Sequence, residues 1–139
     1  MRESSKPTID ATNQNFAPQS PPNTQELAWQ IATAAEDKKA QDIVLLKVDE
    51  VSYLADYFVI ATGFSRAQLN AIAESIEERL EEQYNLHPVR VSGKKDGDWI
   101  VQDYGDVIAH IFLPEERKYY NLEAFWGHAQ RIEFISQPS

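Results

Sequence analysis

The sequence of 139 residues contains no cysteine. Disulfide bonds, thiolate catalysis and sulfur-ligated metal sites are therefore excluded, although this absence does not by itself identify a reducing compartment. Long apolar runs are missing too. None approaches the roughly 18 residues that a membrane-spanning helix needs. The first 25 residues lack the apolar core of a signal peptide and are too poor in arginine for a transit peptide. We therefore expect a cytoplasmic protein with no membrane partner.

Basic residues are also scarce, since 13 Lys and Arg stand against 22 Asp and Glu and give a formal net charge of -9. The first 25 residues carry two charges of each sign, so the whole acidic excess belongs to residues 26–139. Nucleic-acid binding draws most of its non-specific strength from Lys and Arg that neutralise phosphates, so this charge disfavours nucleic acids and phosphorylated substrates. A basic protein is the partner that fits better.

Apolar residues make up 42% of the chain and aromatic residues 11%, which at this length is enough for one folded core. The core is not expected to include residues 1–23. This segment is rich in Ser, Thr, Asn, Gln and Pro, and apart from Met1 its only larger apolar side chains are Ile9 and Phe16. Because it cannot offset its own ordering entropy, we predict a flexible polar tail.

The next part of the chain alternates between helical and strand patterns. Helical spacing predicts a first helix from an N-cap at Thr24 to about Ala40. Residues 42–48 and 57–63 are nearly continuous in apolar residues, as strands covered on both faces tend to be. Ser65 is the expected N-cap of a second helix. Its core-facing stripe is predicted to consist of Leu69, Ile72, Ala73, Ile76 and Leu80.

Three more strands are predicted at 88–93, 99–104 and 107–113, joined by Gly- and Asp-containing hairpin turns. A final helical segment, 114–126, begins at a proline, which suits the first turn of a helix. This order of elements predicts a single α/β (α+β) domain, in which one mixed five-stranded sheet is flanked by helices.

Acidic residues are the candidates for an enzyme site, because two carboxylates on neighbouring strands can hold Mg²⁺ with water and a phosphate. Asp96 and Asp98, however, lie in a predicted hairpin turn. Asp103 and Asp106 flank Tyr104-Gly105, where turn conformation alone also favours Asp and Gly. A metal-dependent nucleotide-binding enzyme therefore stays as the alternative interpretation rather than the preferred one.

Other catalytic patterns are weaker. His110 alternates with Ile108 and Phe112 along its strand and is expected to be a hydrogen-bonded structural residue. His87 and His128 are too far away in the sequence to complete a recognisable metal motif. No nucleophile elbow, phosphate-binding loop or dinucleotide fingerprint is present. We predict no catalytic residue, no metal site and no cofactor.

Aromatic residues gather in the last third of the chain. Aromatic and Arg side chains anchor protein interfaces, but large aromatic residues also fill cores, so both interpretations stay open for any single ring. The residues concerned are Trp99, Tyr104, Tyr119, Tyr120 and Trp126, with Arg117 and several acids among them.

Three stretches carry a family resemblance. They are DIVLLKVDEVSYLADYFVIATGFSRAQLNAIAESIEE (42–78), DWIVQDYGDVIAHIF (98–112) and RKYYNLEAFWG (117–127). Together they closely resemble the ribosomal silencing factor family, also called Iojap. The resemblance defines a domain at residues 24–128, and it leaves the tail at 1–23 and a C-terminal extension at 129–139 outside.

The resemblance implies a non-enzymatic translation repressor. Such a factor binds the large ribosomal subunit through ribosomal protein uL14 and blocks association with the small subunit under nutrient limitation or in stationary phase. The resemblance also implies a core related to nucleotidyltransferases and a homodimer that can form when the factor is free. The nucleotidyltransferase Gly-Ser pair is interrupted here, because Phe64 separates Gly63 from Ser65. Activity by that route is therefore not expected.

The same resemblance suggests which residues bind the partner. Trp99 would supply the apolar anchor, and Asp103 and Asp106 would face Lys or Arg on the basic ribosomal protein. Tyr104 and Gly105 would shape the contact. The full predicted set is Trp99, Asp103, Tyr104, Gly105, Asp106, Arg117 and Tyr120.

Overall fold

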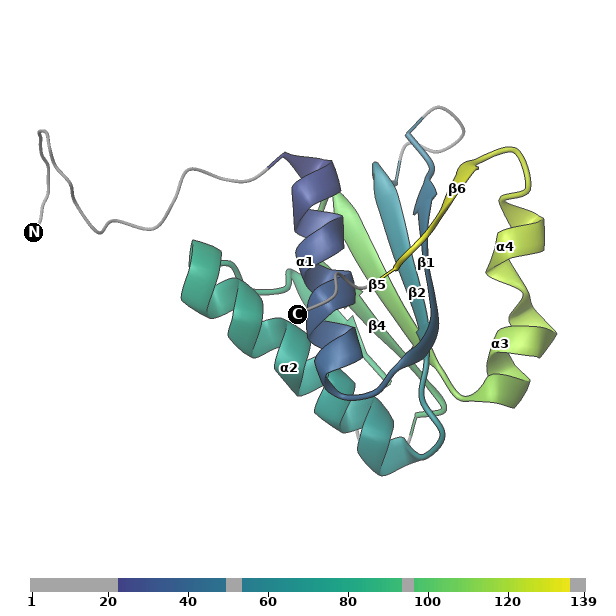
Figure 1. Ribbon diagram of the computed structural model, residues 1–139, viewed down its shortest axis with the longest axis horizontal. Coiled ribbons are helices and arrows are strands. Elements are labelled where there is room, and N and C mark those ends of the chain that lie inside the picture. Colours follow the sequence, from purple (N-terminus) through teal and green to yellow (C-terminus); the bar gives the residue numbers. More distant parts are fainter. Residues whose placement is uncertain (1–22, 50–53, 94–96, 136–139) are drawn as a thin grey trace, which may run out of the picture.

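A computed structural model describes residues 23–49, 54–93 and 97–135 (Figure 1). The tail predicted at residues 1–23 lies outside these ranges except for Asn23, and so does Asp96. Within the described residues, no helix combines the length and the hydropathy needed to cross a bilayer.

The fold is one mixed sheet between two helical layers (Figure 1). Helices α1 and α2 cover one face, and the shorter α3 and α4 lie over the other. The helices are α1 (Thr24–Asp37), α2 (Arg66–Tyr84), α3 (Pro114–Tyr120) and α4 (Leu122–Phe125). The strands are β1 (Gln41–Lys47), β2 (Tyr57–Thr62), β3 (Arg90–Ser92), β4 (Trp99–Asp103), β5 (Val107–Phe112) and β6 (Gln130–Glu133).

The strand order is β3-β4-β5-β2-β1-β6, and only the β2–β5 pair is parallel. All six residues of β2 are buried, as expected for a strand covered on both faces. The predicted antiparallel pairings β3–β4 and β4–β5 are confirmed. The mixed α+β architecture is therefore the one that the sequence predicts.

The predicted number of strands is wrong by one. The sheet has six strands, because β6 pairs antiparallel with β1 at the edge. β6 (Gln130–Glu133) lies in the segment 129–139, which the sequence resemblance leaves outside the domain. Its sequence, QRIE, contains one apolar residue, Ile132, and three of its four residues are exposed. An edge strand of this kind carries almost no hydrophobic signal, so the periodicity of the sequence could not indicate it.

Two helix ends also differ from expectation. The N-cap of α1 is Asn23 rather than Thr24, because the Asn23 side chain accepts a hydrogen bond from the Glu26 backbone N–H at 2.7 Å. The single helix predicted at 114–126 is two helices. Asn121 adopts a left-handed conformation (φ 45°) that ends α3, and its side chain then caps α4. The Ser65 cap of α2 and the five buried stripe residues are confirmed.

Alternation along β5 divides the core in two. Val107, Ala109 and Ile111 pack beneath α1 and α2, whereas Phe112 and the half-buried Ile108 belong to a second cluster on the side of α3 and α4. His110 has its ring against Phe112 and therefore lies on that second side, as the sequence predicts.

Candidate functional site

Six of the seven predicted partner-binding residues fall into two groups, one at each end of β4. Trp99 begins this strand and contacts Tyr120 of α3, with 4.6 Å between ring centroids. Asp103 ends the strand, and Tyr104, Gly105 and Asp106 form the turn into β5. Four residues of strand separate the groups by about 13 Å. Because side chains alternate along a strand, Trp99 and Asp103 point to the same face of the sheet.

The turn residues already have structural roles. The Asp103 carboxylate accepts a hydrogen bond from the Gly105 N–H at 2.8 Å, and Gly105 has a positive φ of 89°. The Asp106 carbonyl accepts from the N–H groups of Asp56 and Tyr57. The side chain of Asp106 remains exposed, so it is the carboxylate of this turn that is most available to a partner.

Tyr104 belongs to the opposite side of the sheet, where its ring packs against the core beneath α1 and α2. Its hydroxyl is buried, and no residue that the structure describes hydrogen bonds to it. Burial, and secondarily the charge of Glu77, raises the pKa of this hydroxyl. The Tyr104 ring therefore lies on the face of the sheet opposite Trp99, and a partner-binding role for this residue stays a prediction.

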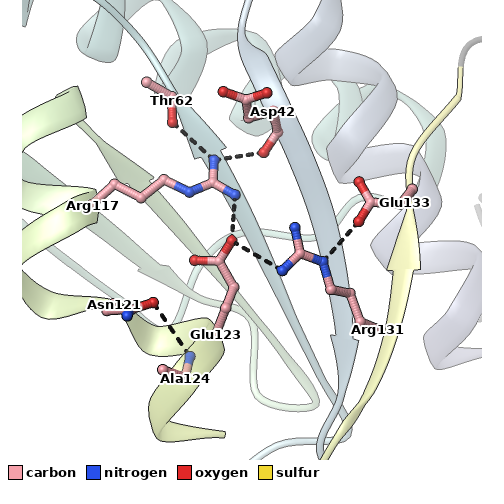
Figure 2. A network of polar contacts seen from close by, with 8 residues as sticks. All are labelled: Asp42, Thr62, Arg117, Asn121, Glu123, Ala124, Arg131 and Glu133. Carbon is pink, nitrogen blue, oxygen red and sulfur yellow. Dashed lines mark hydrogen bonds and ion pairs between the residues drawn. The ribbon is translucent and has the colours of Figure 1, made fainter. Parts of the chain in front are cut away.

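Arg117 lies inside a polar network rather than at the surface (Figure 2). Its side chain is 12% exposed and donates hydrogen bonds to the Asp42 carbonyl, to the Thr62 hydroxyl at 2.8 Å and to the Glu123 carboxylate at 2.8 Å. Arg131 reaches the same carboxylate oxygen at 3.9 Å. These contacts tie α3 and α4 to β1 and β2. A partner-binding role for Arg117 stays a prediction.

An aromatic patch surrounds Trp99 on the side of α3, and we define it as Trp99, Tyr119 and Tyr120. The indole of Trp99 stacks on Phe112 with centroids 4.8 Å apart and also contacts Tyr120, whose ring in turn contacts Phe112 at 6.4 Å. Tyr119 is 81% exposed and Tyr120 47% exposed. Exposure of these neighbouring rings favours the interface interpretation over the core interpretation for both tyrosines.

Phe125 is an exposed aromatic residue that the sequence patterns do not single out. It is 75% exposed on α4 and its ring contacts Trp126. The exposure of Phe125 depends on the break at Asn121. Because α4 begins anew at Leu122, its side chains do not continue the helical spacing of α3, so the face on which Phe125 lies cannot be read from one continuous helix.

His110 is buried and hydrogen bonded, as the sequence predicts. It is 8% exposed, and its Nδ1 accepts a hydrogen bond from the Trp99 indole N–H at 3.2 Å. Its Nε2 is buried without a hydrogen-bond partner among the described residues. Burial lowers the pKa of His110 from 6.5 to about 4.

The shifted pKa of His110 predicts a loss of stability in acid. In the unfolded chain this imidazole takes up a proton below about pH 6.5, whereas in the folded protein it does so only near pH 4. The unfolded state therefore binds more protons between these values, and the free energy of unfolding should fall by about 3 kcal/mol across that range. Urea unfolding at pH 7.5 and 4.5 measures this. His110→Phe should show a smaller difference, and an equal difference in both proteins would contradict the assignment.

The acids considered for metal binding do not assemble. Asp98 is paired with Arg66 at 2.7 Å, and Asp103 is used by the turn. Among residues 23–49, 54–93 and 97–135, no group of three or more His, Asp or Glu side chains is arranged to hold a metal ion. The described part of the chain thus offers no observation in favour of the metal-dependent alternative.

Comparisons with known proteins agree with the sequence resemblance. A family model described as "Ribosomal silencing factor during starvation" matches residues 21–139. A ribosomal silencing factor from Halalkalibacterium halodurans is 39% identical over 111 residues, which cover 80% of this chain and 94% of that protein. The chloroplastic protein Iojap of Arabidopsis thaliana is 42% identical over 106 residues, covering 76% of this chain and 44% of the plant protein.

Two further matches extend the comparison. The mouse protein named "Mitochondrial assembly of ribosomal large subunit protein 1" is 31% identical over 98 residues, covering 69% of this chain and 43% of the mouse protein. A crystal structure from Chromobacterium violaceum superposes with a TM-score of 0.71 at 35% identity, covering 83% of this chain and 89% of the other. From the family match and these relatives together, the chain belongs to the ribosomal silencing factor family.

Proposed function

We propose that this chain is a non-enzymatic translation repressor that binds the large ribosomal subunit through ribosomal protein uL14 and thereby blocks joining of the small subunit. The names of its relatives support the general role, since they refer to ribosome silencing and, for the mouse protein, to the ribosomal large subunit. Nutrient limitation or stationary phase is the condition under which we expect the repressor to act, in the cytoplasm.

The aromatic patch is the observation that carries the proposal. Two exposed tyrosines and a half-buried tryptophan lie together at one end of β4. Clusters of this kind are enriched at the centres of protein interfaces, where Trp and Tyr contribute most to affinity. Trp99 is the expected anchor, because a partner that covers it would complete the burial that Phe112 and Tyr120 begin.

Charge indicates the chemistry of the partner. Asp106 is exposed at the far end of β4, and Glu115 and the partly exposed Glu116 begin α3, close in sequence to the patch. A basic protein surface would complement these acids around the aromatic contact. The two ends of β4 are about 13 Å apart, so one interface of ordinary size can include both.

Sedimentation with purified ribosomal subunits tests the proposal. The protein should migrate with large subunits and not with small subunits. When added before the two subunits are mixed, it should reduce the amount of joined ribosomes. Migration with neither subunit, or binding that leaves subunit joining unchanged, would reject the proposed function.

Asp106→Lys is expected to slow association with the large subunit. The new lysine would face a basic partner, so like charges would reduce the association rate roughly tenfold at low ionic strength, and by less as salt screens them. Association rates measured at two salt concentrations test this. Glu78→Lys is the matched control, because Glu78 is exposed on α2, on the opposite side of the sheet. Equal effects of the two substitutions would show that only net charge matters.

A further inference from the structure

The orientation of Trp99 is fixed by more than stacking. Its indole contacts two rings, Phe112, which is inclined by 23°, and Tyr120, with ring centroids 4.8 and 4.6 Å away, and these two rings also contact each other at 6.4 Å. Ring contacts tolerate a broad range of geometries and do not by themselves distinguish the two flipped orientations of the indole. The hydrogen bond from the indole N–H to His110 Nδ1, at 3.2 Å, selects one orientation.

His110 is itself held rigidly. Its ring meets Phe58 edge to face, with centroids 4.9 Å apart. Its backbone lies in the sheet between Ile60 of β2 and Val101 of β4. Since the residue is 8% exposed, the imidazole has little freedom to turn away from the indole.

The hydrogen bond to Trp99 requires a protonation state of His110 that is unfavourable for the stability of the folded protein. Because Nδ1 accepts the indole hydrogen bond, the proton of the neutral ring is on Nε2. That Nε2 is buried, and no group in the described part of the chain accepts from it. An unpartnered buried donor destabilises a protein, and an apolar ring of similar size would avoid the loss. Stability alone therefore does not account for a histidine here.

We propose that His110 is a positioning residue that holds the Trp99 indole in the orientation that docks on the partner. This inference rests on the proposed function, in which Trp99 is the anchor. An anchor that is oriented before contact loses less rotamer freedom when it is buried by the partner. His110 contributes through Trp99 and does not itself touch the partner.

The test compares His110→Phe with His110→Asn. Phenylalanine keeps an aromatic ring but removes the acceptor, whereas the Asn side-chain oxygen can take the place of Nδ1. We expect His110→Phe to be folded and at least as stable as the wild type, yet to bind large subunits roughly 3- to 10-fold more weakly through faster dissociation. His110→Asn should restore most of the affinity.

A spectroscopic readout follows the hydrogen bond directly. The chain has three tryptophans, so three indole N–H signals are expected in a nitrogen-15 correlation spectrum, and Trp99→Phe identifies the one that belongs to Trp99. This signal should move in His110→Phe and stay near its wild-type position in His110→Asn. The signals of Trp29 and Trp126 should change less.

Gln102→Leu is the matched control. Gln102 is a fully buried polar residue of β4 whose side chain donates to the backbone carbonyl of Ala73 in α2, on the face opposite Trp99. Its replacement should change stability without changing affinity for the large subunit. Wild-type affinity in His110→Phe, or equal affinities in His110→Phe and His110→Asn, would overturn the positioning role alone. Failure of the wild-type protein to bind large subunits would overturn the proposed function and the positioning role with it.

Discussion

Arg117→Met is expected to lower the free energy of unfolding by about 3 kcal/mol. The substitution removes a guanidinium that is 12% exposed and leaves the Glu123 carboxylate, 16% exposed, without its main partner. Removing one member of a buried ion pair costs about 3–5 kcal/mol, because the remaining charge stays desolvated. The low end applies here, since Arg131 still lies 3.9 Å from the same carboxylate. Urea unfolding at neutral pH provides the measurement.

Two companion variants separate the buried pair from charge in general. Arg131→Met removes a cation that is 50% exposed, and ion pairs at that exposure contribute at most about 1 kcal/mol. Arg117→Met combined with Glu123→Leu should recover part of the loss, because neither charge is then left alone. If Arg117→Met were no more destabilising than Arg131→Met, the network would not be what holds α3 and α4 to the sheet.

Trp99→Ala is expected to weaken binding to the large subunit by about 2 kcal/mol or more, which is roughly 30-fold, chiefly through faster dissociation. The indole is the proposed anchor, and alanine leaves the partner surface opposite it without a contact. The variant should also lose its ability to block subunit joining. Dissociation rates from immobilised large subunits, together with a joining assay, measure both effects.

Folding must be separated from binding in this experiment, because Trp99 also packs on Phe112 and Tyr120. Trp29→Ala supplies the comparison. Trp29 is likewise half-buried, but its ring packs on Phe134 and on the core beneath α1 and α2. It should lose stability and keep its affinity. A folded Trp99→Ala protein that binds and blocks joining normally would remove Trp99 from the interface.

Elements with a strong apolar period were predictable from the sequence. The stripe on α2 follows from a spacing of 3.6 residues and the face occupied by His110 from a spacing of 2, whereas the covered strands β1 and β2 follow from continuous apolar runs. Features without such a period were not predictable. β6 contains one apolar residue, and the break at Asn121 depends on a left-handed conformation that asparagine tolerates but does not require.

The sequence predicts which residue types make up the candidate site, but it does not predict which contacts those residues make in the folded protein. Trp99, Tyr120 and Asp106 stand out in the sequence as residues that favour interfaces, and the structure leaves each at least partly accessible. Arg117 looked the same, yet its partners Asp42 and Thr62 are 75 and 55 positions away in the sequence. Only the folded sheet brings such distant residues together, so local patterns could not distinguish a buried arginine from an exposed one.

The pairing of β6 with β1 is expected to form late in folding, after β1 has paired with β2. Val44 of β1 pairs with Glu133, so this contact spans most of the domain and carries a large loop-closure entropy. During synthesis, β1 can pair with β2 long before residue 133 exists, and its other edge then stays open. β1 is mostly apolar, and an open apolar edge recruits other chains. A chain that ends before Gln130 should therefore aggregate, because the polar edge strand that shields β1 is missing.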